Sequence, residues 1–340
     1  MAHRVGIIGC GKILIRHIES IEQNNNFELV SVCDINKNKA NKAATAHGAS
    51  SYTSYKEMID EKNLSLVVVA TPNSLHFEQA KYALENGCDV IVEKPVSLNP
   101  SHVESLSKIA SAHNRKAYAV LQVRLNPTVE TVKNLLDNDF LGKIRGVSLI
   151  QRWQRPFSYF SGWRSEPFVG GGTLYECGIH YMDVVCKMFG RPKVHSAKIY
   201  NTKHKHTEIE DTIYSILDFG EYGGTLEINV SSEPKNLECS ISILGEKGYI
   251  KIGGHALDKI EEFGFLEEKM NNEFEVILSS MSRPKEANNY GTHSGSCPNH
   301  PALYERLNEF DILESKDVIC LIDEVYKSVG TRYYKQGKQL

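Results

Sequence analysis

The chain has 340 residues, and 39 lysines and arginines against 42 aspartates and glutamates give a formal net charge of −3. Hydrophobic residues make up 41% of the chain and charged residues 24%, which is typical of a soluble enzyme and excludes a disordered or fibrous protein. The length favours two domains. Because the chain has no block of lysine or arginine, its charge pattern argues against nucleic acid and acidic membrane surfaces as partners.

The apolar runs are short. The run Leu66–Ala70, for example, is far shorter than the roughly 20 residues that cross a bilayer. The first residues lack the long apolar region and the cleavage site of a signal peptide. They are predicted to form the first strand instead. The eight cysteines are scattered and form no C-x-x-C pair, which favours reduced thiols. We therefore expect a cytoplasmic protein.

Up to about residue 122, short apolar runs alternate with amphipathic stretches. The runs that predict strands are Val5–Ile8, Leu29–Cys33, Leu66–Ala70, Val90–Val92 and Ala117–Leu121. The stretches that predict helices are Lys12–Gln23, Leu75–Glu85 and His102–His113. Strands that are apolar on both faces and separated by helices are typical of a parallel sheet covered on two sides. Residues 1–122 are therefore expected to form an α/β domain.

After about residue 143 the pattern changes to strands in which apolar and polar residues alternate. Expected strands are Ile144–Ile150, Thr212–Leu217, Thr225–Val230, Glu238–Leu244 and Tyr249–Ile252, with turns at Gly223-Gly224 and Gly245–Gly248. Expected helices are Leu174–Met188, Pro301–Leu313 and Lys316–Gly330. Residues 123–340 are therefore predicted to form an α+β domain with a large, mostly antiparallel sheet, whose C-terminal helix is free to pack back on the first domain.

A G-x-G sequence follows the first strand and opens the first helix. Gly9, Gly11, Lys12 and Ile13 are thus placed where backbone N–H groups and the helix dipole hold a pyrophosphate. The second strand ends at Asp34, 23 residues past Gly11, where a carboxylate accepts hydrogen bonds from a ribose. This spacing predicts a Rossmann domain that binds NAD, although Lys37 and Lys39 leave NADP open. The alternative is a pair of tight-turn glycines and a strand-end acid without a ligand.

Two further turns narrow the family. The third strand leads into Ala70-Thr71-Pro72-Asn73-Ser74-Leu75-His76, and the fourth ends in Glu93-Lys94-Pro95. The glycine-led segment Gly171–Asp183 contains an acid, a glycine and a histidine. Together these motifs resemble the Gfo/Idh/MocA family of sugar and cyclitol dehydrogenases. The resemblance covers nearly the whole chain, and it implies cofactor contacts from Thr71, Pro72, Asn73, His76, Glu93 and Lys94.

The same resemblance implies that Lys94 and His180 are catalytic. Lys94 follows a strand at the carboxyl edge of the parallel sheet, where open α/β sheets bind ligands, and a partly desolvated lysine can serve as a base. Its alternative role is that of a surface lysine beside Glu93. His180 is one helical turn after Glu176 and one before Asp183. Without the resemblance, a core histidine is its more common role.

Further segments are similar to the branch of this family that oxidises UDP-N-acetyl-2-amino-2-deoxyglucuronate at C3. They are Gln122–Pro127, Trp153–Pro156, Gly162–Arg164, Ile209–Thr212, Pro234–Glu238, Ile243–Gly248 and Asn299–Tyr304. The branch implies an enzyme of surface-polysaccharide sugar biosynthesis. Three alternatives stay open: a UDP-N-acetylglucosamine 3-dehydrogenase, a free-sugar or inositol dehydrogenase, and a sugar sensor without activity.

Candidate substrate contacts combine guanidinium groups and rings, which suits a substrate with a diphosphate and a sugar. They are Arg155, Tyr159, Trp163 and Arg164, and the resemblance adds Arg124, Glu176, His180 and His300. The alternative for the arginines is a solvated sheet edge. The role of Glu176 is open, because the family carries Asp, and the branch often Asn, at this position.

We expect no metal site. His204, His206, His293, Cys297 and His300 stand in loops rich in Gly, Ser and Asn, without the ligand spacing of a zinc knuckle.

An antiparallel sheet that exposes an apolar face is commonly covered by a second copy. The chain is therefore expected to be a homodimer or homotetramer. Its expected small-molecule partner is a UDP-sugar.

Overall fold

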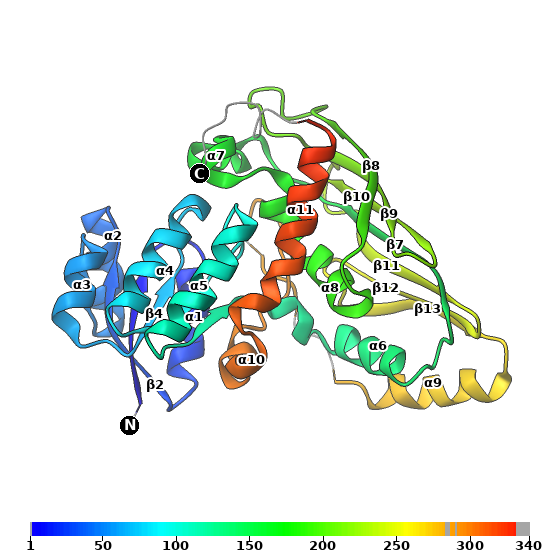
Figure 1. Cartoon of the computed structure of the whole chain (residues 1–340), viewed down its shortest axis with the longest axis horizontal. Coiled ribbons are helices and arrows are strands. Elements are labelled where there is room, and N and C mark those ends of the chain that lie inside the picture. The colour runs from blue at the N-terminus through cyan, green and yellow to red at the C-terminus, as the bar shows by residue number, and fades with distance from the viewer. Residues whose placement is uncertain (1, 283–285, 290, 331–340) are drawn as a thin grey trace. The chain divides into compact units, whose positions relative to one another are not determined.

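The computed structural model describes residues 2–282, 286–289 and 291–330 (Figure 1). The chain divides into two compact units. Of the described residues, the first unit comprises 2–121 and 300–319, and the second comprises those in 122–299 together with 320–330. The sequence predicts a second domain of residues 123–340 whose C-terminal helix is free to pack back on the first domain, and in the structure the segment 300–319 groups with the first unit.

The first unit contains a six-stranded parallel sheet in the order β3-β2-β1-β4-β5-β6. Its strands are β1 (His3–Ile8), β2 (Phe27–Cys33), β3 (Ser50–Tyr52), β4 (Leu66–Val69), β5 (Asp89–Val92) and β6 (Ala117–Ala119). Its helices are α1 (Leu14–Glu22), α2 (Lys37–His47), α3 (Tyr55–Lys62), α4 (His76–Glu85), α5 (Pro100–Ala112) and α10 (His300–Glu305), with 3-10 turns η1 (Asn73–Leu75), η6 (Leu307–Glu309) and η7 (Ile312–Ser315). The predicted parallel sheet is confirmed.

Burial and capping explain these elements. All four residues of β4 are buried, as expected for a central strand covered on both faces. The Asn99 side chain accepts the Ser101 N–H and Pro100 occupies the first turn, so α5 begins there. Residues 37–62 form α2, β3 and α3, which the sequence analysis did not predict. The apolar residues of α2 are alanines, whose periodicity is weak.

The second unit contains a seven-stranded sheet in the order β13-β12-β11-β7-β10-β9-β8. Its strands are β7 (Ile144–Arg152), β8 (Lys193–Tyr200), β9 (Thr212–Asp218), β10 (Gly223–Asn229), β11 (Glu238–Gly245), β12 (Gly248–Gly253) and β13 (Lys259–Phe265). All neighbouring pairs are antiparallel except β7 and β10, so the prediction of a mostly antiparallel sheet is confirmed. The predicted turn at Gly223-Gly224 is wrong, because both glycines belong to β10.

Helices and short turns complete the second unit. They are η2 (Gln122–Leu125), α6 (Pro127–Asp137), η3 (Phe157–Tyr159), η4 (Gly162–Ser165), α7 (Pro167–Gly170), the π-helical turn η5 (Leu174–Gly178), α8 (Ile179–Phe189) and α9 (Glu268–Ser280). The helix α11 (Lys316–Ser328) begins in the first unit and continues in the second. The predicted helix Leu174–Met188 is therefore a π-turn followed by an α-helix. None of the described helices has the length and apolar composition that a membrane crossing requires.

Candidate active site

The phosphate-binding turn between β1 and α1 has the geometry that its glycines predict. Gly9 has φ +107°, and a Cβ atom there would lie 2.3 Å from the carbonyl oxygen of Ala70. A Cβ atom at Gly11, by contrast, would meet no atom within 4 Å, so the backbone borders open space before α1. A ligand phosphate can therefore approach the backbone of Gly11 closely.

Asp34 stands directly after β2, and its carboxylate is held in one orientation. Oδ2 accepts the Cys10 N–H at 2.9 Å, and Oδ1 accepts the Asn36 N–H at 2.8 Å. The carboxylate thus bridges the glycine turn and the strand end, where a ribose diol is bound in dinucleotide sites. Burial raises the pKa of the neighbouring Cys10 thiol to about 11 and Asp34 adds to the shift, so this thiol is uncharged at neutral pH.

His76 connects two of the loops that the sequence analysis assigned to the cofactor. Its ring is fully buried, with Nδ1 2.7 Å from the Pro95 carbonyl oxygen and Nε2 2.9 Å from that of Thr71. Burial lowers the pKa of His76, although the two backbone hydrogen bonds oppose this shift. The ring is therefore neutral near pH 7 and donates to one carbonyl at a time. Asn73, in the same loop, is also buried.

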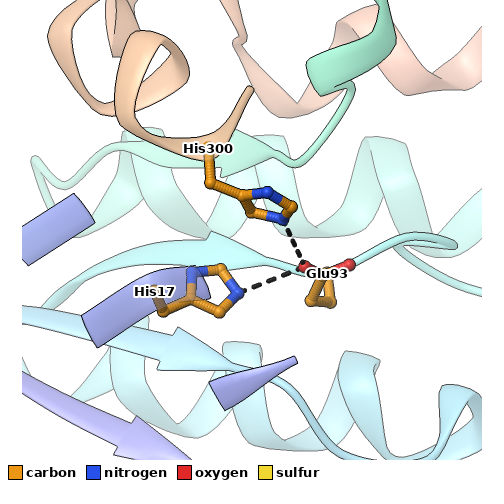
Figure 2. Close-up of side chains that lie close together, drawn as sticks. All are labelled: His17, Glu93 and His300. Carbon is orange, nitrogen blue, oxygen red and sulfur yellow. Dashed lines mark hydrogen bonds and ion pairs between the residues drawn. The ribbon is translucent and has the colours of Figure 1, made fainter. Parts of the chain in front are cut away.

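Glu93 directly follows β5 and lies in a buried cluster with two histidines (Figure 2). His17 Nε2 donates to Glu93 Oε1 at 3.1 Å, and His300 Nε2 donates to the same oxygen at 3.4 Å. The other carboxylate oxygen accepts the Lys94 N–H at 3.0 Å. Among the described residues these three side chains are also the group whose ligand atoms lie close enough for a metal ion. His300, which the resemblance implied as a substrate contact, is 1% exposed and belongs to the first unit.

In the second unit, glycines shape the start of η5. Gly172 has φ +91°, and a Cβ atom there would lie 2.5 Å from Tyr326 Oη. Tyr326 donates to Glu210 Oε1 at 2.6 Å and accepts the Leu174 N–H at 3.1 Å. The Thr173 N–H also donates to Glu210, at 2.8 Å. The glycine run therefore lets the chain approach these side chains, which hold the first N–H groups of the helix that carries Glu176 and His180.

Arg155 follows β7 and is 2% exposed. Its Nη1 donates to the Gln154 carbonyl oxygen at 2.7 Å, while its Nε has no hydrogen-bond partner among the described residues. The guanidinium lies over the rings of Trp153 and Tyr159, with its central carbon 4.4 and 5.1 Å from their centroids. A buried cation that contacts rings, and that pairs with no carboxylate of the described ranges, is suited to an anionic ligand.

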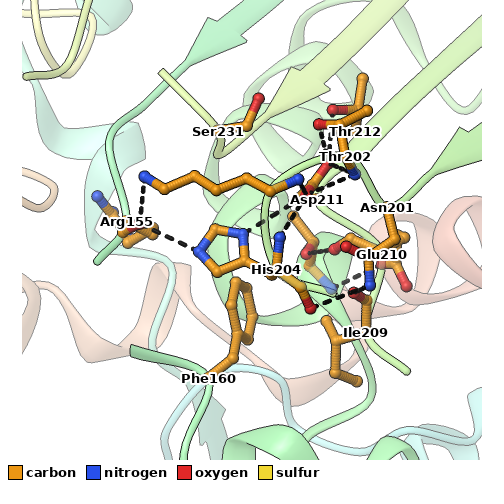
Figure 3. A network of polar contacts seen from close by, with 12 residues as sticks. Arg155, Phe160, Asn201, Thr202, His204, Ile209, Glu210, Asp211, Thr212 and Ser231 are labelled. Atoms are coloured by element: carbon orange, nitrogen blue, oxygen red, sulfur yellow. Dashed lines mark hydrogen bonds and ion pairs between the residues drawn. The ribbon is translucent and has the colours of Figure 1, made fainter. Parts of the chain in front are cut away.

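The backbone of Arg155 is fixed by its neighbours (Figure 3). Lys203 Nζ and His204 Nε2 donate to the Arg155 carbonyl oxygen at 3.0 and 3.1 Å. Asp211 accepts the N–H groups of Thr202, Lys203 and His204, which sets the course of this loop. Burial alone would raise the pKa of Asp211, but these hydrogen bonds and His204 hold it well below its usual range. Asp211 is therefore ionised and structural.

Arg164, Glu176, Tyr159 and Trp163 form a second cluster, and their contact with substrate stays a prediction. Arg164 Nε donates to Glu176 Oε2 at 2.8 Å, and its guanidinium carbon lies 4.3 Å from the centre of the Trp163 ring and 5.3 Å from that of Tyr159. Although burial opposes it, Glu176 raises the pKa of Arg164 above its usual range. The charge of Arg164 is thus balanced by Glu176, in contrast to that of Arg155.

Arg124 and His180 are both associated with α8. Arg124 makes a bidentate pair with Asp183, with Nε···Oδ2 and Nη2···Oδ1 distances of 2.7 Å. Its charge is balanced inside the protein, and its contact with substrate stays a prediction. His180 is 7% exposed and stands three residues before Asp183 on the same helix. Lys94 belongs to the first unit and His180 to the second.

Several residues of these networks were missed by the sequence analysis. His17 is a polar residue on the buried face of α1, beside Ile18 and Ile21, and this position was its only signal. Tyr304 Oη bonds to His17 Nδ1 at 2.9 Å and comes from α10. Glu210 and Asp211 stood within a segment that carried the resemblance, but spacing alone gave them no role.

Comparison with known proteins agrees with both units. Residues 3–121 match the model of an oxidoreductase family with an NAD-binding Rossmann fold, and residues 129–251 match the GFO/IDH/MocA C-terminal domain. The WlbA dehydrogenase from Bordetella pertussis, solved with NADH and UDP-GlcNAcA, is 28% identical with a TM-score of 0.85 over 97% of each chain. The WlbA dehydrogenase from Chromobacterium violaceum, solved with the same ligands, is 26% identical with a TM-score of 0.84 over 97% of this chain and 94% of that one.

Among curated proteins, the D-glucoside 3-dehydrogenase of Escherichia coli K12 is 27% identical over 72% of this chain and 75% of its own length. The glycine turn, the open space at Gly11 and the oriented Asp34 carboxylate fit the cofactor of the matched fold, so NAD is the cofactor. The chain belongs to the Gfo/Idh/MocA family of NAD-dependent oxidoreductases.

Proposed function

We propose that the protein oxidises the C3 hydroxyl of a UDP-linked 2-acetamido sugar, with NAD as the oxidant. The family supports a sugar dehydrogenase, and two relatives at 26–28% identity were solved with UDP-GlcNAcA. The observation in this chain that carries the proposal is Arg155, a buried guanidinium without a carboxylate partner among the described residues. An anionic substrate group supplies the charge that this side chain lacks.

Lys94 and His180 are the proposed catalytic residues. Bound NAD supplies an acceptor for the hydride from sugar C3, while the hydroxyl proton leaves to a protein base and the C3–O bond becomes a carbonyl. Lys94 and His180 share the removal of that proton, and the group that retains its own proton stabilises the developing oxyanion. The glycine turn and Asp34 hold the dinucleotide, and Thr71, Pro72, Asn73 and His76 form the loops beside it.

The leading substrate is UDP-N-acetyl-2-amino-2-deoxyglucuronate, by likeness to the two WlbA enzymes. One observation favours UDP-N-acetylglucosamine as the second candidate. Glu176 already balances Arg164, so this cluster offers no free cation to a sugar carboxylate. The free cysteines support a reducing compartment, and we propose the cytoplasm.

A substrate panel tests the proposal. The protein is incubated with NAD and each of the two UDP-sugars, N-acetylglucosamine, glucose and myo-inositol, and NADH is read by its fluorescence. We expect kcat/KM to be about 100-fold higher for one UDP-sugar than for any free sugar, because the nucleotide contributes binding energy. Equal efficiency with the sugar that lacks UDP would contradict it. Binding of a sugar without NADH formation indicates a sensor instead.

A further inference from the structure

The turn that carries Lys94 is held by side chains from three separate segments. His17 comes from α1, His76 from α4 and His300 from the start of α10, and all three rings are at most 1% exposed. His17 and His300 contact the carboxylate of Glu93, the residue before Lys94 (Figure 2). His76 contacts the carbonyl oxygen of Pro95, the residue after Lys94. Each peptide neighbour of Lys94 thus has a buried histidine partner.

The hydrogen bonds of Glu93 are consistent with two histidines that donate to an ionised carboxylate. His17 donates through Nε2, so its Nδ1 accepts from the Tyr304 hydroxyl at 2.9 Å. His300 donates through Nε2, and its Nδ1 has no hydrogen-bond partner among the described residues. Burial alone would raise the pKa of Glu93, but the two histidine hydrogen bonds hold it well below its usual range. Burial lowers the pKa of His300.

The side chains of His17, Glu93 and His300 also lie close enough together to bind a metal ion. Distances of 3.1 and 3.4 Å between the ring nitrogens and Glu93 Oε1 are similar to the spacing of ligand atoms around zinc. Zinc requires a fourth ligand or a water, however, and the cluster is buried with its second carboxylate oxygen already bonded to the Lys94 N–H. Protons complete the network without a further ligand, so hydrogen bonding is the better interpretation.

We propose that His17 and His300 are positioning residues for Lys94. They hold the Glu93 carboxylate from two elements, and Glu93 in turn holds the Lys94 N–H, so the backbone that carries the Lys94 side chain, in the turn after β5, is fixed before substrate binds. This inference rests on the proposed function, in which Lys94 acts on the sugar hydroxyl. A displacement of about 1 Å at such a group lowers turnover by about 100-fold. By preventing such a displacement of Lys94, the hydrogen-bond network maintains the rate of catalysis.

His300 offers a matched pair of variants. The side-chain N–H of glutamine reaches the place of the histidine Nε2–H, and nothing is lost at Nδ1, which has no hydrogen-bond partner among the described residues. His300→Gln therefore keeps the bond to Glu93, whereas His300→Leu removes it. We expect His300→Leu to lower kcat about tenfold or more, with the KM of the sugar and the Kd of NADH within about twofold of the parent. His300→Gln restores kcat to within about threefold.

Two further variants support this comparison. Tyr304→Phe removes only the hydroxyl on His17 Nδ1, so it keeps the cluster folded and we expect a kcat between those of the parent and His300→Leu. His113→Leu, at an exposed histidine of the same unit, is the control for the loss of a histidine and leaves kcat unchanged. If His300→Leu retains the parental kcat, or if NADH binding falls as much as kcat, the inference is wrong.

A second measurement is independent of the substrate. The amine of Lys94 is labelled with trace acetic anhydride across pH 6–10 with NADH bound, and its peptide is quantified by mass spectrometry against that of Lys42, an exposed lysine on α2. We expect His300→Leu to change the relative reactivity of Lys94 by about threefold or more, and His300→Gln to leave it unchanged. A changed reactivity in a protein that oxidises no sugar would leave the inference standing while the proposed function fails.

The remaining outcomes overturn the inference. If the parent oxidises a UDP-sugar but His300→Leu changes neither the reactivity of Lys94 nor kcat, the function stands and the positioning role fails. Elemental analysis of the purified parent and of His300→Leu tests whether the cluster binds zinc. One equivalent of zinc in the parent that is absent from the variant would identify the cluster as a metal site. The interpretation of the cluster as a hydrogen-bond network would then be wrong.

Discussion

A lysine and a histidine from different units remove one proton in the proposed mechanism, so the loss of either should affect turnover more than binding. For Lys94→Met and His180→Asn we expect kcat to fall by about 100-fold or more, because a general base contributes at least this factor. The Kd of NAD is measured separately by fluorescence titration and stays within about threefold. Lys108→Met, at an exposed lysine of the same unit, is the control.

The pair is not catalytic if both variants bind NAD and turn over within about threefold of the parent. Glu176 and Tyr175 would then become the next candidates. Both are buried in η5, the π-helical turn that precedes His180.

Arg155 should act on substrate binding instead. Arg155→Met removes the buried charge while keeping much of the side-chain volume. A hydrogen bond to a charged group is worth about 2 kcal/mol, so we expect the KM of the UDP-sugar to rise about 30-fold with kcat nearly unchanged. The control is Arg145→Met, at an exposed arginine on β7. An unchanged KM in a variant with the parental melting temperature would show that this guanidinium binds no substrate anion.

At the scale of single residues, the sequence could predict groups that stand beside a motif but not the networks behind them. Arg155, Tyr159, Arg164 and Glu176 were each predicted to contact substrate, and Tyr159 lies against both guanidinium groups, of which Arg164 pairs with Glu176. Glu176 pairs with Arg164, and Arg155 has no carboxylate partner in the part of the chain that the structure describes. Both facts depend on side-chain directions that spacing does not give. The partners of Glu93 are 76 and 207 residues away along the chain, so no local pattern could indicate them.

The bidentate pair of Arg124 and Asp183 joins η2 to α8, the helix that carries His180. Their side chains are 9% and 2% exposed. Asp183→Asn removes the charge and leaves a buried guanidinium without its carboxylate, so we expect the free energy of unfolding to fall by about 3 kcal/mol. The measurement is urea unfolding followed by circular dichroism, with the change in midpoint converted through the shared slope.

The matched control is Asp137→Asn on α6, whose side chain is 59% exposed and pairs with Lys133. Exposed pairs of this kind contribute about 0.5 kcal/mol or less. Similar losses for Asp183→Asn and Asp137→Asn would mean that the buried pair adds nothing to the stability of α8.

Among the elements, those with strong periodicity were predicted and those shaped by close backbone approach were not. Gly223-Gly224 resembled a turn, but a Cβ atom at Gly224 would lie 2.8 Å from the Val147 carbonyl oxygen. The glycine therefore permits the parallel pairing of β10 with β7, and the chain reverses before it. The π-turn at Leu174–Gly178 has the composition of an α-helix, so no local pattern distinguishes it, and its first N–H groups are held by Glu210 and Tyr326 from distant segments.

For the whole molecule, buried histidines predict a loss of stability in weak acid. Burial lowers the pKa of His76 and of His300, so both are neutral in the folded protein while the unfolded chain takes up protons near pH 6.5. Their contribution is fully present above that pH and is lost as the pH falls below it. Two such groups give a slope of up to about 2.7 kcal/mol per pH unit.

Two buried carboxylates affect the stability of the folded protein over a lower pH range than the histidines do. Because the pKa of Glu93 and that of Asp211 lie well below their usual values, their contribution is lost only as the pH falls below about 4.5. Urea midpoints measured between pH 8 and 4 separate the two ranges, and His300→Gln should reduce the slope between pH 7 and 5 by about half. A parental midpoint that stays constant from pH 7 to 5 would contradict the assignment of neutral histidines.

The outer face of the seven-stranded sheet predicts self-association. Tyr214 and Ile216 on β9 and Tyr200 on β8 are 44%, 52% and 50% exposed, and the rings of the two tyrosines are 6.3 Å apart. Leu244 on β11 and Tyr249 on β12, which are paired in the sheet, are 53% and 40% exposed. Apolar side chains repeated over four strands of one sheet differ from the isolated ones common on monomers. A second copy related by a two-fold axis presents the same face, so each apolar side chain meets another.

Light scattering at micromolar concentration is therefore expected to give the mass of a dimer or tetramer. A double variant, Tyr214→Glu with Ile216→Glu, places charges in this face and should yield the monomer mass with the sheet intact, because two like-charged patches would face each other across the axis. Val276→Glu, at an exposed valine on α9, adds a charge outside the sheet and should keep the parental mass. A monomeric parent would show that this face is a solvated surface, and a double variant that remains oligomeric would place the interface elsewhere on the chain.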